Sequence, residues 1–314
     1  MLRPILVCFA FAMASAHAEI AVVLNSADET LSLVDTLTYK ELRRIPVGKE
    51  PHHLMASADG QLIVANAASN ELLFLDPASG EIRSRLRNIS DPYQIGFSPD
   101  RKWFAATSLR LDRFDLYDAK TYALVKRFPA PKTPSHLAFD SQSKYVFVTL
   151  QESDELMAID LAKLEIVWKM PVGKQPAGVW MTPGDKYLLV AATGADYFDV
   201  IDWRERKMVK RVTTGKGAHN FVALGDKRHL FMSNRMGNSI VKIDQQKLEV
   251  VSTLDAPGGP DCMWITADGK QLWYTGRFSR KVWVIDLASG KIAQSIPVGR
   301  SPHGVYFRSH APLE

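Results

Sequence analysis

An aspartate recurs along the chain at intervals of 41 or 42 residues, and this spacing limits the possible fold more than any other feature. The series consists of Asp35, Asp76, Asp118, Asp160, Asp202, Asp244 and Asp286. A second series keeps the same spacing and consists of Pro51, Pro92, Pro134, Pro176, Ala218, Pro260 and Pro302. A repeat of roughly 20 to 50 residues is typical of solenoids and propellers. Two series in register therefore predict seven repeat units.

Each unit has the pattern of a small antiparallel sheet. Residues 51–87 hold four short apolar runs, separated by turn-forming stretches such as Ala58-Asp59-Gly60 and the segment from Asp76 to Gly80. Short apolar runs bounded by Gly, Asn, Asp and Ser are typical of strands. Four strands repeated with a period of about 40 residues form one propeller blade each. The sequence therefore predicts an all-β, seven-bladed β-propeller of four-stranded antiparallel blades.

The two ends of the chain complement each other. The unit that opens at Pro302 has room for a single strand, at 303–308, whereas three strands are expected before the first full unit, at 20–25, 30–35 and 40–47. Pairing of the two ends would remove the open sheet edges of the array. We therefore expect a seventh blade closed by the N- and C-terminal strands.

The first eighteen residues have the pattern of a secretory signal peptide. Arg3 precedes an apolar run at 5–14, and Ala16-His17-Ala18 fits a small-residue cleavage site. A membrane span needs about 20 apolar residues, so no span is expected. These features predict removal of residues 1–18, a single propeller domain at 19–314 and a periplasmic or secreted location. A net charge of +5 is too small for a dedicated nucleic-acid binder.

Several segments resemble the YVTN-type β-propeller repeat. They are IPVGKEPHHLMASADG (45–60), VFVT (146–149), MPVGKQPAGVWMTPGDKYLLV (170–190) and SIPVGRSPHGVYF (295–307). The resemblance implies the propeller fold. It also implies relatives such as a periplasmic propeller that accompanies quinone-dependent alcohol catabolism and the haem d1 propeller of cytochrome nitrite reductases. A haem d1-like or a quinone cofactor is therefore conceivable, although the C-x-x-C-H of a cytochrome c domain is absent from the sequence.

Five histidines fall within the two positions that follow the Pro or Ala that opens a unit: His52, His53, His136, His219 and His303. The starts of the first strands in a propeller converge on one mouth, so these side chains are expected to be neighbours. Histidine donates and accepts hydrogen bonds, titrates near neutral pH and ligates metals or haem iron. One interpretation is a binding surface. A second is a haem or metal ligand among His53, His136, His219 and His303, and a third is a set of polar groups that satisfy turn backbone.

Three arginines fall in loops between the second and third strands, on the same face: Arg110, Arg235 and Arg277. Arginine recognises carboxylates and phosphates through two parallel hydrogen bonds. The sequence therefore predicts that a small anionic ligand, a cofactor or a periplasmic protein partner binds this face. No nucleophile elbow, phosphate loop or carboxylate pair is present, so no catalysis is required. A lactonase-like hydrolase and a plain scaffold without a small ligand remain alternatives.

Overall fold

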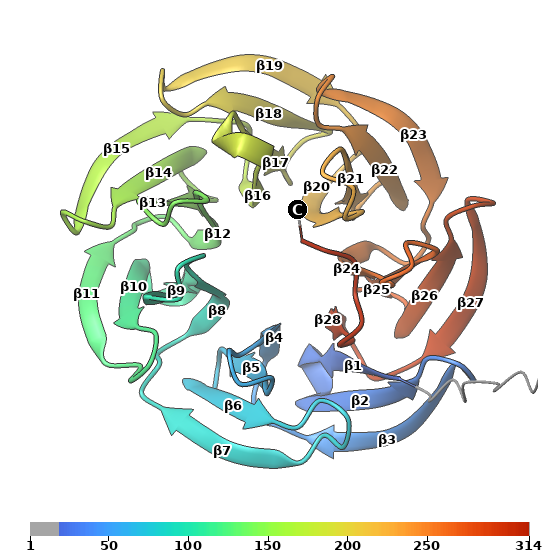
Figure 1. Ribbon diagram of the computed structural model, residues 1–314. Coiled ribbons are helices and arrows are strands. Elements are labelled where there is room, and N and C mark those ends of the chain that lie inside the picture. The colour runs from blue at the N-terminus through green and yellow to red at the C-terminus, as the bar shows by residue number, and fades with distance from the viewer. Residues whose placement is uncertain (1–18, 314) are drawn as a thin grey trace, which may run out of the picture.

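The computed structural model describes residues 19–313 and shows a seven-bladed β-propeller in this range (Figure 1). Each blade is a four-stranded antiparallel sheet, and its first strand lies nearest the central axis. The predicted blade number and strand number are confirmed. The expected signal peptide, at 1–18, lies outside the described residues.

We number the blades from the first complete repeat and give their strands from the axis outwards. Blade 1 contains β4 (Pro51–Ala56), β5 (Leu62–Asn66), β6 (Glu71–Leu75) and β7 (Ile82–Arg87). Blade 2 contains β8 (Pro92–Phe97), β9 (Trp103–Ser108), β10 (Arg113–Asp118) and β11 (Leu124–Pro129). Blade 3 contains β12 (Pro134–Phe139), β13 (Tyr145–Leu150), β14 (Glu155–Asp160) and β15 (Glu165–Pro171).

The remaining blades follow the same order. Blade 4 contains β16 (Pro176–Met181), β17 (Leu188–Ala192), β18 (Tyr197–Asp202) and β19 (Lys207–Thr213). Blade 5 contains β20 (Ala218–Ala223), β21 (His229–Asn234), β22 (Ser239–Asp244) and β23 (Glu249–Asp255). Blade 6 contains β24 (Pro260–Ile265), β25 (Gln271–Gly276), β26 (Lys281–Asp286) and β27 (Lys291–Pro297). Three short 3-10 turns lie in connections: η1 (Ser26–Asp28), η2 (Leu109–Leu111) and η3 (Pro183–Asp185).

Blade 7 joins the two ends of the chain. Its strand order is β28 (Pro302–Tyr306), β1 (Ile20–Asn25), β2 (Thr30–Asp35) and β3 (Lys40–Pro46). The pairing of β28 with β1 is antiparallel, and Val23 lies opposite Val305. The predicted closure is confirmed, with strand ends one or two residues from those expected.

The periodic aspartates fix the outer hairpin of each blade. Asp76 follows β6, and its Oδ1 accepts hydrogen bonds from the backbone N–H groups of Ala78 and Ser79, at 3.0 and 2.8 Å. Asp118 makes the same pair of bonds with Lys120 and Thr121. These bonds lower the pKa of both carboxyl groups. The aspartate recurs because this short turn has backbone donors that only a compact acceptor reaches.

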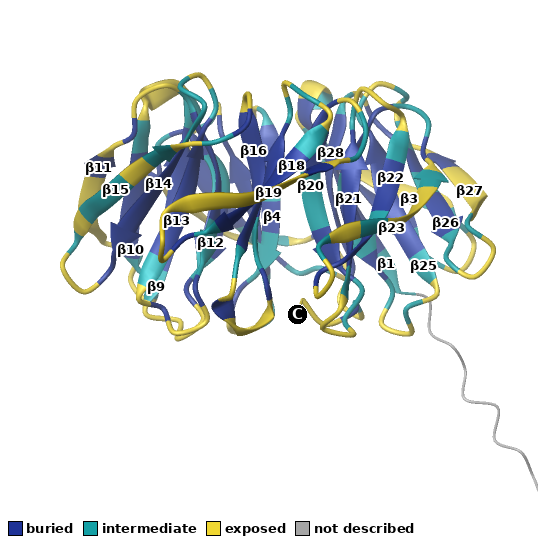
Figure 2. Cartoon of the chain, turned by 90° about the horizontal axis from the view of Figure 1, so that it is seen from above, coloured by how far each residue is buried: buried dark blue, intermediate teal, exposed yellow. Residues whose placement is uncertain are grey.

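The apolar core lies in layers between neighbouring blades. One layer joins Leu24 and Leu31 of blade 7 to Leu62 and Leu73 of blade 1. The outermost strands are largely exposed, whereas the inner three are buried (Figure 2). Packing of blade on blade therefore holds the inner strands in fixed positions around the axis. Among residues 19–313, no helix is long and apolar enough to cross a membrane.

Candidate functional site

The start of each inner strand lies beside the loop between the second and third strands of the same blade. The backbone N–H of Arg235 donates to the carbonyl of Gly217 at 2.8 Å, and that of Arg277 donates to the carbonyl of Gly259 at 2.9 Å. We call this end of the propeller the mouth. It gathers residues from all the repeats, because each repeat places the same two loops there.

A β-bulge follows the opening residue of every inner strand. In blade 1, Pro51 lies opposite Asn66 but His53 lies opposite Ala65, so His52 is the extra residue. The same irregularity occurs in the other six blades. Bulges re-aim side chains and are frequent next to functional sites. They are the local reason that the residues after the opening Pro or Ala gather at the axis.

Six of these residues form a closed ring of contacts, which we call the ring: Asp261, His303, His52, Tyr93, His136 and His219. The centroids of His52 and His303 are 3.8 Å apart, and those of His52 and Tyr93 are 3.6 Å apart. Tyr93 meets His136 edge to face at 6.3 Å, and His136 meets His219 at 5.3 Å. The four histidines and Asp261 are buried, with side chains or residues no more than 6% exposed.

Blade 4 contributes no side chain to the ring. Its equivalent positions are Ala177 and Gly178, and a Cβ on Gly178 would collide with the backbone carbonyl of His219. The inner strands β16 and β20 therefore approach too closely for a side chain at this position. At blade 4 the ring is continued by a direct contact between His136 of blade 3 and His219 of blade 5.

In blades 2, 3, 5 and 6, a hydroxyl group on the second strand ties the blade to the next one. It donates to the carbonyl of the residue directly after the opening proline of that next blade at 2.6–2.9 Å: Thr107 to Ser135, Thr149 to Ala177, Ser233 to Asp261 and Thr275 to His303. In blade 4 the same position is Ala191, and Thr193 Oγ1 instead donates to the carbonyl of Ala218 at 2.8 Å. Blades 1 and 7 hold Ala65 and Leu24 at the hydroxyl position.

Imidazoles replace the hydroxyl in those two blades. His52 Nδ1 donates to the carbonyl of Tyr93 at 2.8 Å, and His303 Nδ1 donates to the carbonyl of His52 at 2.5 Å. A carbonyl only accepts, so both Nδ1 atoms carry the hydrogen. These two histidines thus hold blades together through Nδ1, and their Nε2 atoms are acceptors when the rings are neutral.

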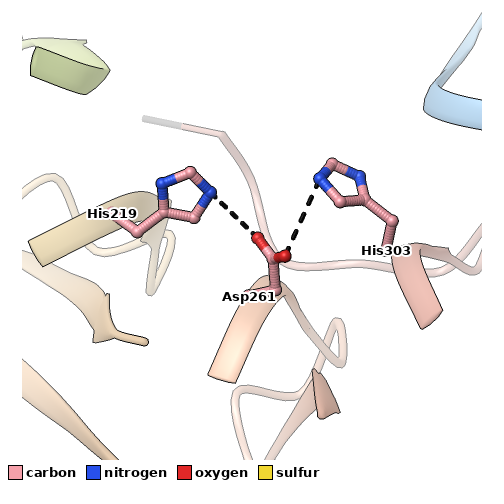
Figure 3. A group of neighbouring side chains, drawn as sticks. All are labelled: His219, Asp261 and His303. Carbon is pink, nitrogen blue, oxygen red and sulfur yellow. Dashed lines mark ion pairs between the residues drawn. The ribbon is translucent and has the colours of Figure 1, made fainter. Parts of the chain in front are cut away.

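Asp261 is the charged centre of the ring (Figure 3). Its Oδ1 lies 3.0 Å from His219 Nε2, and its Oδ2 lies 3.7 Å from His303 Nε2. Arg235 Nη2 lies 2.9 Å from Oδ1 and also contacts His219 Nε2. Arg277 Nε lies 3.7 Å from Oδ2. Two guanidinium groups therefore share a single buried carboxylate.

The centre formed by Arg235, Arg277 and Asp261 carries one net positive charge. Burial opposes ionisation of Asp261, but the charge of Arg235 holds its pKa well below the usual range. Burial lowers the pKa of His219, and it holds the pKa of His303 well below the ordinary value. The histidines are therefore neutral near pH 7. Two arginine charges face one carboxylate charge.

The predicted site residues do not all reach the ring. His52, His136, His219 and His303 belong to it, and Arg235 and Arg277 contact Asp261. His53 is partly buried and makes none of the ring contacts. Burial lowers the pKa of His53 to about 4. Burial also lowers the pKa of His136, and the nearby His53 adds to that shift.

Arg110 points elsewhere because it occupies a different loop position. The first residue of the loop between strands two and three is Arg235 in blade 5 and Arg277 in blade 6, and both contact Asp261. In blade 2 the repeat register gives this position to Leu109. Arg110 is the second residue. Its guanidinium pairs with Glu50 and Asp91 at the rim.

Sequence analysis did not single out Tyr93 and Asp261 as site residues. Both stand directly after an opening proline, at the position of His52 and His303. The repeat register would have found them, whereas a search by residue type for histidine and arginine did not. Burial raises the pKa of Tyr93 to about 12, so its hydroxyl remains protonated.

Surface hollows elsewhere do not include the ring. One of about 530 Å³ is lined by Trp168, Trp203 and Arg206 among others, and one of about 460 Å³ by Asp76 and Arg308 among others. Both lie at the ends of the strands remote from the mouth. The side chains of Arg235 and Arg277, which are 21% and 24% exposed, are the accessible part of the charged centre.

The comparisons with known proteins agree with this architecture. The YncE-like β-propeller family matches residues 4–313. The uncharacterized protein YncE of Salmonella typhimurium (strain LT2) is 30% identical over 122 residues, which is 36% of this chain and 34% of YncE. The matched region therefore spans about a third of that relative.

Solved structures resemble the chain at lower identity. A functionally unknown protein from Desulfotomaculum acetoxidans superposes with a TM-score of 0.80 at 13% identity, over 94% of this chain and all of its own. Dihydro-heme d1 dehydrogenase NirN, in complex with DHE, gives 0.69 at 17% identity, over 92% of this chain and 75% of NirN. Hydrazine synthase of Kuenenia stuttgartiensis gives 0.70 at 16% identity, over 84% and 96%. These similarities show the fold, and the family match shows that the chain belongs to the YncE-like β-propeller family.

Proposed function

We propose that this protein is exported to the periplasm and binds a small anionic ligand at the mouth, through Arg235 and Arg277. The observation that carries the proposal is the shared carboxylate. Two arginines meet one aspartate, and Arg235 Nε and Arg277 Nη1 are buried without a hydrogen-bond partner in the described part of the chain. Buried donors of this kind cost free energy unless an acceptor reaches them. An anion would supply both the acceptor and the missing charge.

Because the ring histidines are neutral, the positive charge that attracts an anion is confined to Arg235 and Arg277. The lowered pKa values of the histidines mean that the ring adds no further positive charge near pH 7. A ligand with one negative charge would then balance the centre. The segment at 1–18 supports the periplasmic location through its charged start, apolar run and cleavage pattern.

A second candidate is a divalent metal ion held by His219, Asp261 and His303. Ligand atoms of these three buried side chains lie within 4.8 Å of one another. His303 Nδ1 donates to a backbone carbonyl, and His219 Nδ1 lies 3.3 Å from Thr193 Oγ1, an arrangement that orients metal-binding imidazoles. Asp261 Oδ2 has no hydrogen-bond partner among the described residues. Against this candidate, Arg235 already donates to the same acceptor atoms.

The experiment uses protein exported by its host, with intact mass checked for a start at Glu19. Titration calorimetry with acetate, phosphate and larger carboxylates is compared for the natural protein, Arg277→Ala and Arg300→Ala. Arg300 lies at the same face but pairs with the partly exposed Asp28, so it is the matched control. Loss of a charge-assisted hydrogen bond weakens binding by roughly 1.5 to 3 kcal/mol, which is about tenfold or more.

Weaker binding in Arg277→Ala alone supports the proposal. Equal binding in all three proteins, or none to any anion, contradicts it. Elemental analysis and an absorption spectrum of the same sample test the alternative. A stoichiometric divalent metal would favour the second candidate over the first, whereas a haem band would count against both.

A further inference from the structure

Two exposed apolar side chains follow the two arginines of the charged centre in sequence, at the loop position that Arg110 holds at the rim in blade 2. Met236 and Phe278 are 63% and 62% exposed, the highest values among the large hydrophobic residues that the structure shows to be exposed. Each follows an arginine that contacts Asp261, in loops of the same register. Exposed apolar side chains that gather on one face mark interaction surfaces, whereas scattered ones are normal. The mouth therefore presents both charge and apolar area on blades 5 and 6.

The two loops are held in fixed positions by the backbone. The N–H of Met236 donates to the carbonyl of Lys216 at 3.1 Å, and the N–H of Phe278 donates to the carbonyl of Gly258 at 2.9 Å. Each side chain lies against a glycine of left-handed conformation, Gly217 for Met236 and Gly259 for Phe278. A Cβ on either glycine would collide with the apolar residue. The turn thus leaves room for Met236 and Phe278 to lie over it.

Ring contacts leave no room for a large group below the arginines. His219, Asp261 and His303 are almost fully buried, so a ligand meets this centre from the outer side. Gly217 and Gly259, against which Met236 and Phe278 lie, each stand two residues before a ring residue, His219 and Asp261. A group that accepts from Arg235 and Arg277 and extends towards the rim of blades 5 and 6 would therefore reach Met236 and Phe278.

We propose that the ligand is an amphipathic monocarboxylate with a flat apolar body. Its carboxylate accepts from Arg235 and Arg277, and its apolar body packs on Met236 and Phe278. A single carboxylate matches the one uncompensated positive charge of the centre better than a doubly charged phosphate monoester. Flat rings suit Phe278 because aromatic stacking adds to the burial of area. This inference rests on the proposed anion-binding function and narrows its ligand class.

The test compares three probes by titration calorimetry on the exported protein: acetate, 2-naphthoate and 2-naphthyl phosphate. We expect 2-naphthoate to bind at least about tenfold more tightly than acetate, because apolar area is buried only by the larger probe. Phe278→Ser and Met236→Ser should each weaken 2-naphthoate several-fold and leave acetate unchanged. Leu42→Ser is the control, since Leu42 is 58% exposed on β3, at the outer edge of blade 7.

The outcomes separate this inference from the function on which it rests. If acetate and 2-naphthoate bind with equal affinity and Phe278→Ser has no effect, the proposal of an amphipathic ligand is overturned, but anion binding stands. Tighter binding of 2-naphthyl phosphate than of 2-naphthoate would overturn the choice of carboxylate. Absence of binding by every probe would overturn the proposed function itself. An apolar surface reserved for a protein partner would also give equal binding of acetate and 2-naphthoate, and would count against the inference.

Discussion

Arg235 of blade 5 and Asp261 of blade 6 form an ion pair across two blades, with Nη2 2.9 Å from Oδ1. The carboxylate is fully buried, whereas the arginine reaches the surface of the mouth. Arg235 thus compensates a buried charge, and its buried Nε has no hydrogen-bond partner among the described residues.

The first prediction concerns this ion pair. Replacing Arg235 with Ala should destabilise the protein by about 1.5 to 3 kcal/mol, because it removes a charge-assisted hydrogen bond to Asp261 Oδ1 and leaves only Arg277, 3.7 Å from Oδ2, to compensate the buried carboxylate. Adding Asp261→Asn to the same chain should recover most of the loss. Denaturant unfolding of the single and double variants measures both effects. A stable single variant, or a double variant no better than the single one, would argue against the pairing.

The second prediction concerns the hydroxyl ties between blades. Thr275 Oγ1 donates to the buried carbonyl of His303 at 2.6 Å. Thr275→Val should cost about 1 to 3 kcal/mol of unfolding free energy, since it leaves that carbonyl without its donor. Thr275→Ser keeps the hydroxyl and serves as the control. Equal stabilities of the Val and Ser variants would show that the tie is unimportant.

The third prediction is a loss of stability on mild acidification. Burial lowers the pKa of His53 to about 4 and holds those of His52, His136 and His303 well below the ordinary value. Between about pH 6.5 and about pH 4, the unfolded chain binds protons that the folded chain does not, so the free energy of unfolding decreases as pH falls.

Melting temperatures across this range measure the effect. Hydrogen bonds lower the pKa values of the turn residues Asp35, Asp76, Asp118 and Asp286, and that of Asp244 to about 2, so these carboxyl groups do not account for the effect. His53→Asn should reduce the slope. A melting temperature that is constant from pH 7 to pH 5 would rule out neutral buried histidines.

The fourth prediction concerns closure of blade 7. Removal of residues 302–314 deletes β28 and uncovers β1, whose Val22 and Leu24 are fully buried in the intact protein. We expect aggregation or a large drop in melting temperature. Removal of residues 313 and 314 alone keeps β28 and should be tolerated. Similar melting of the long truncation and the intact protein would contradict the shared blade.

The periodic residues made the fold accessible from sequence. Asp76 and its equivalents recur because each outer hairpin needs the same acceptor, and Pro51 and its equivalents recur because each inner strand starts with the same bulge. Because the same turn and the same bulge occur in every blade, the residues that form them recur in the sequence at a fixed interval. The end-to-end pairing of β28 with β1 followed from counting the strands that the first and last units lacked.

The site was only partly accessible from sequence because it depends on register and on contacts between blades. Arg110 and Arg235 both lie in loops after a second strand, but one residue of offset directs Arg110 to Glu50 and Arg235 to Asp261. His52 has a structural bond through Nδ1 because Ala65 lacks the hydroxyl found at this position in blades 2, 3, 5 and 6. Residue type alone did not reveal either relationship.

The most direct test of anion binding at the shared carboxylate is the affinity of Asp261→Asn for 2-naphthoate. Asp261 competes with an external anion for Arg235 and Arg277, so removing its charge should leave two unpaired guanidinium charges and tighten binding by about tenfold or more. The isosteric change keeps the side-chain volume, and circular dichroism checks the fold. Tighter binding in Asp261→Asn is the result that the account predicts. Unchanged or weaker binding in a folded Asp261→Asn protein would contradict it.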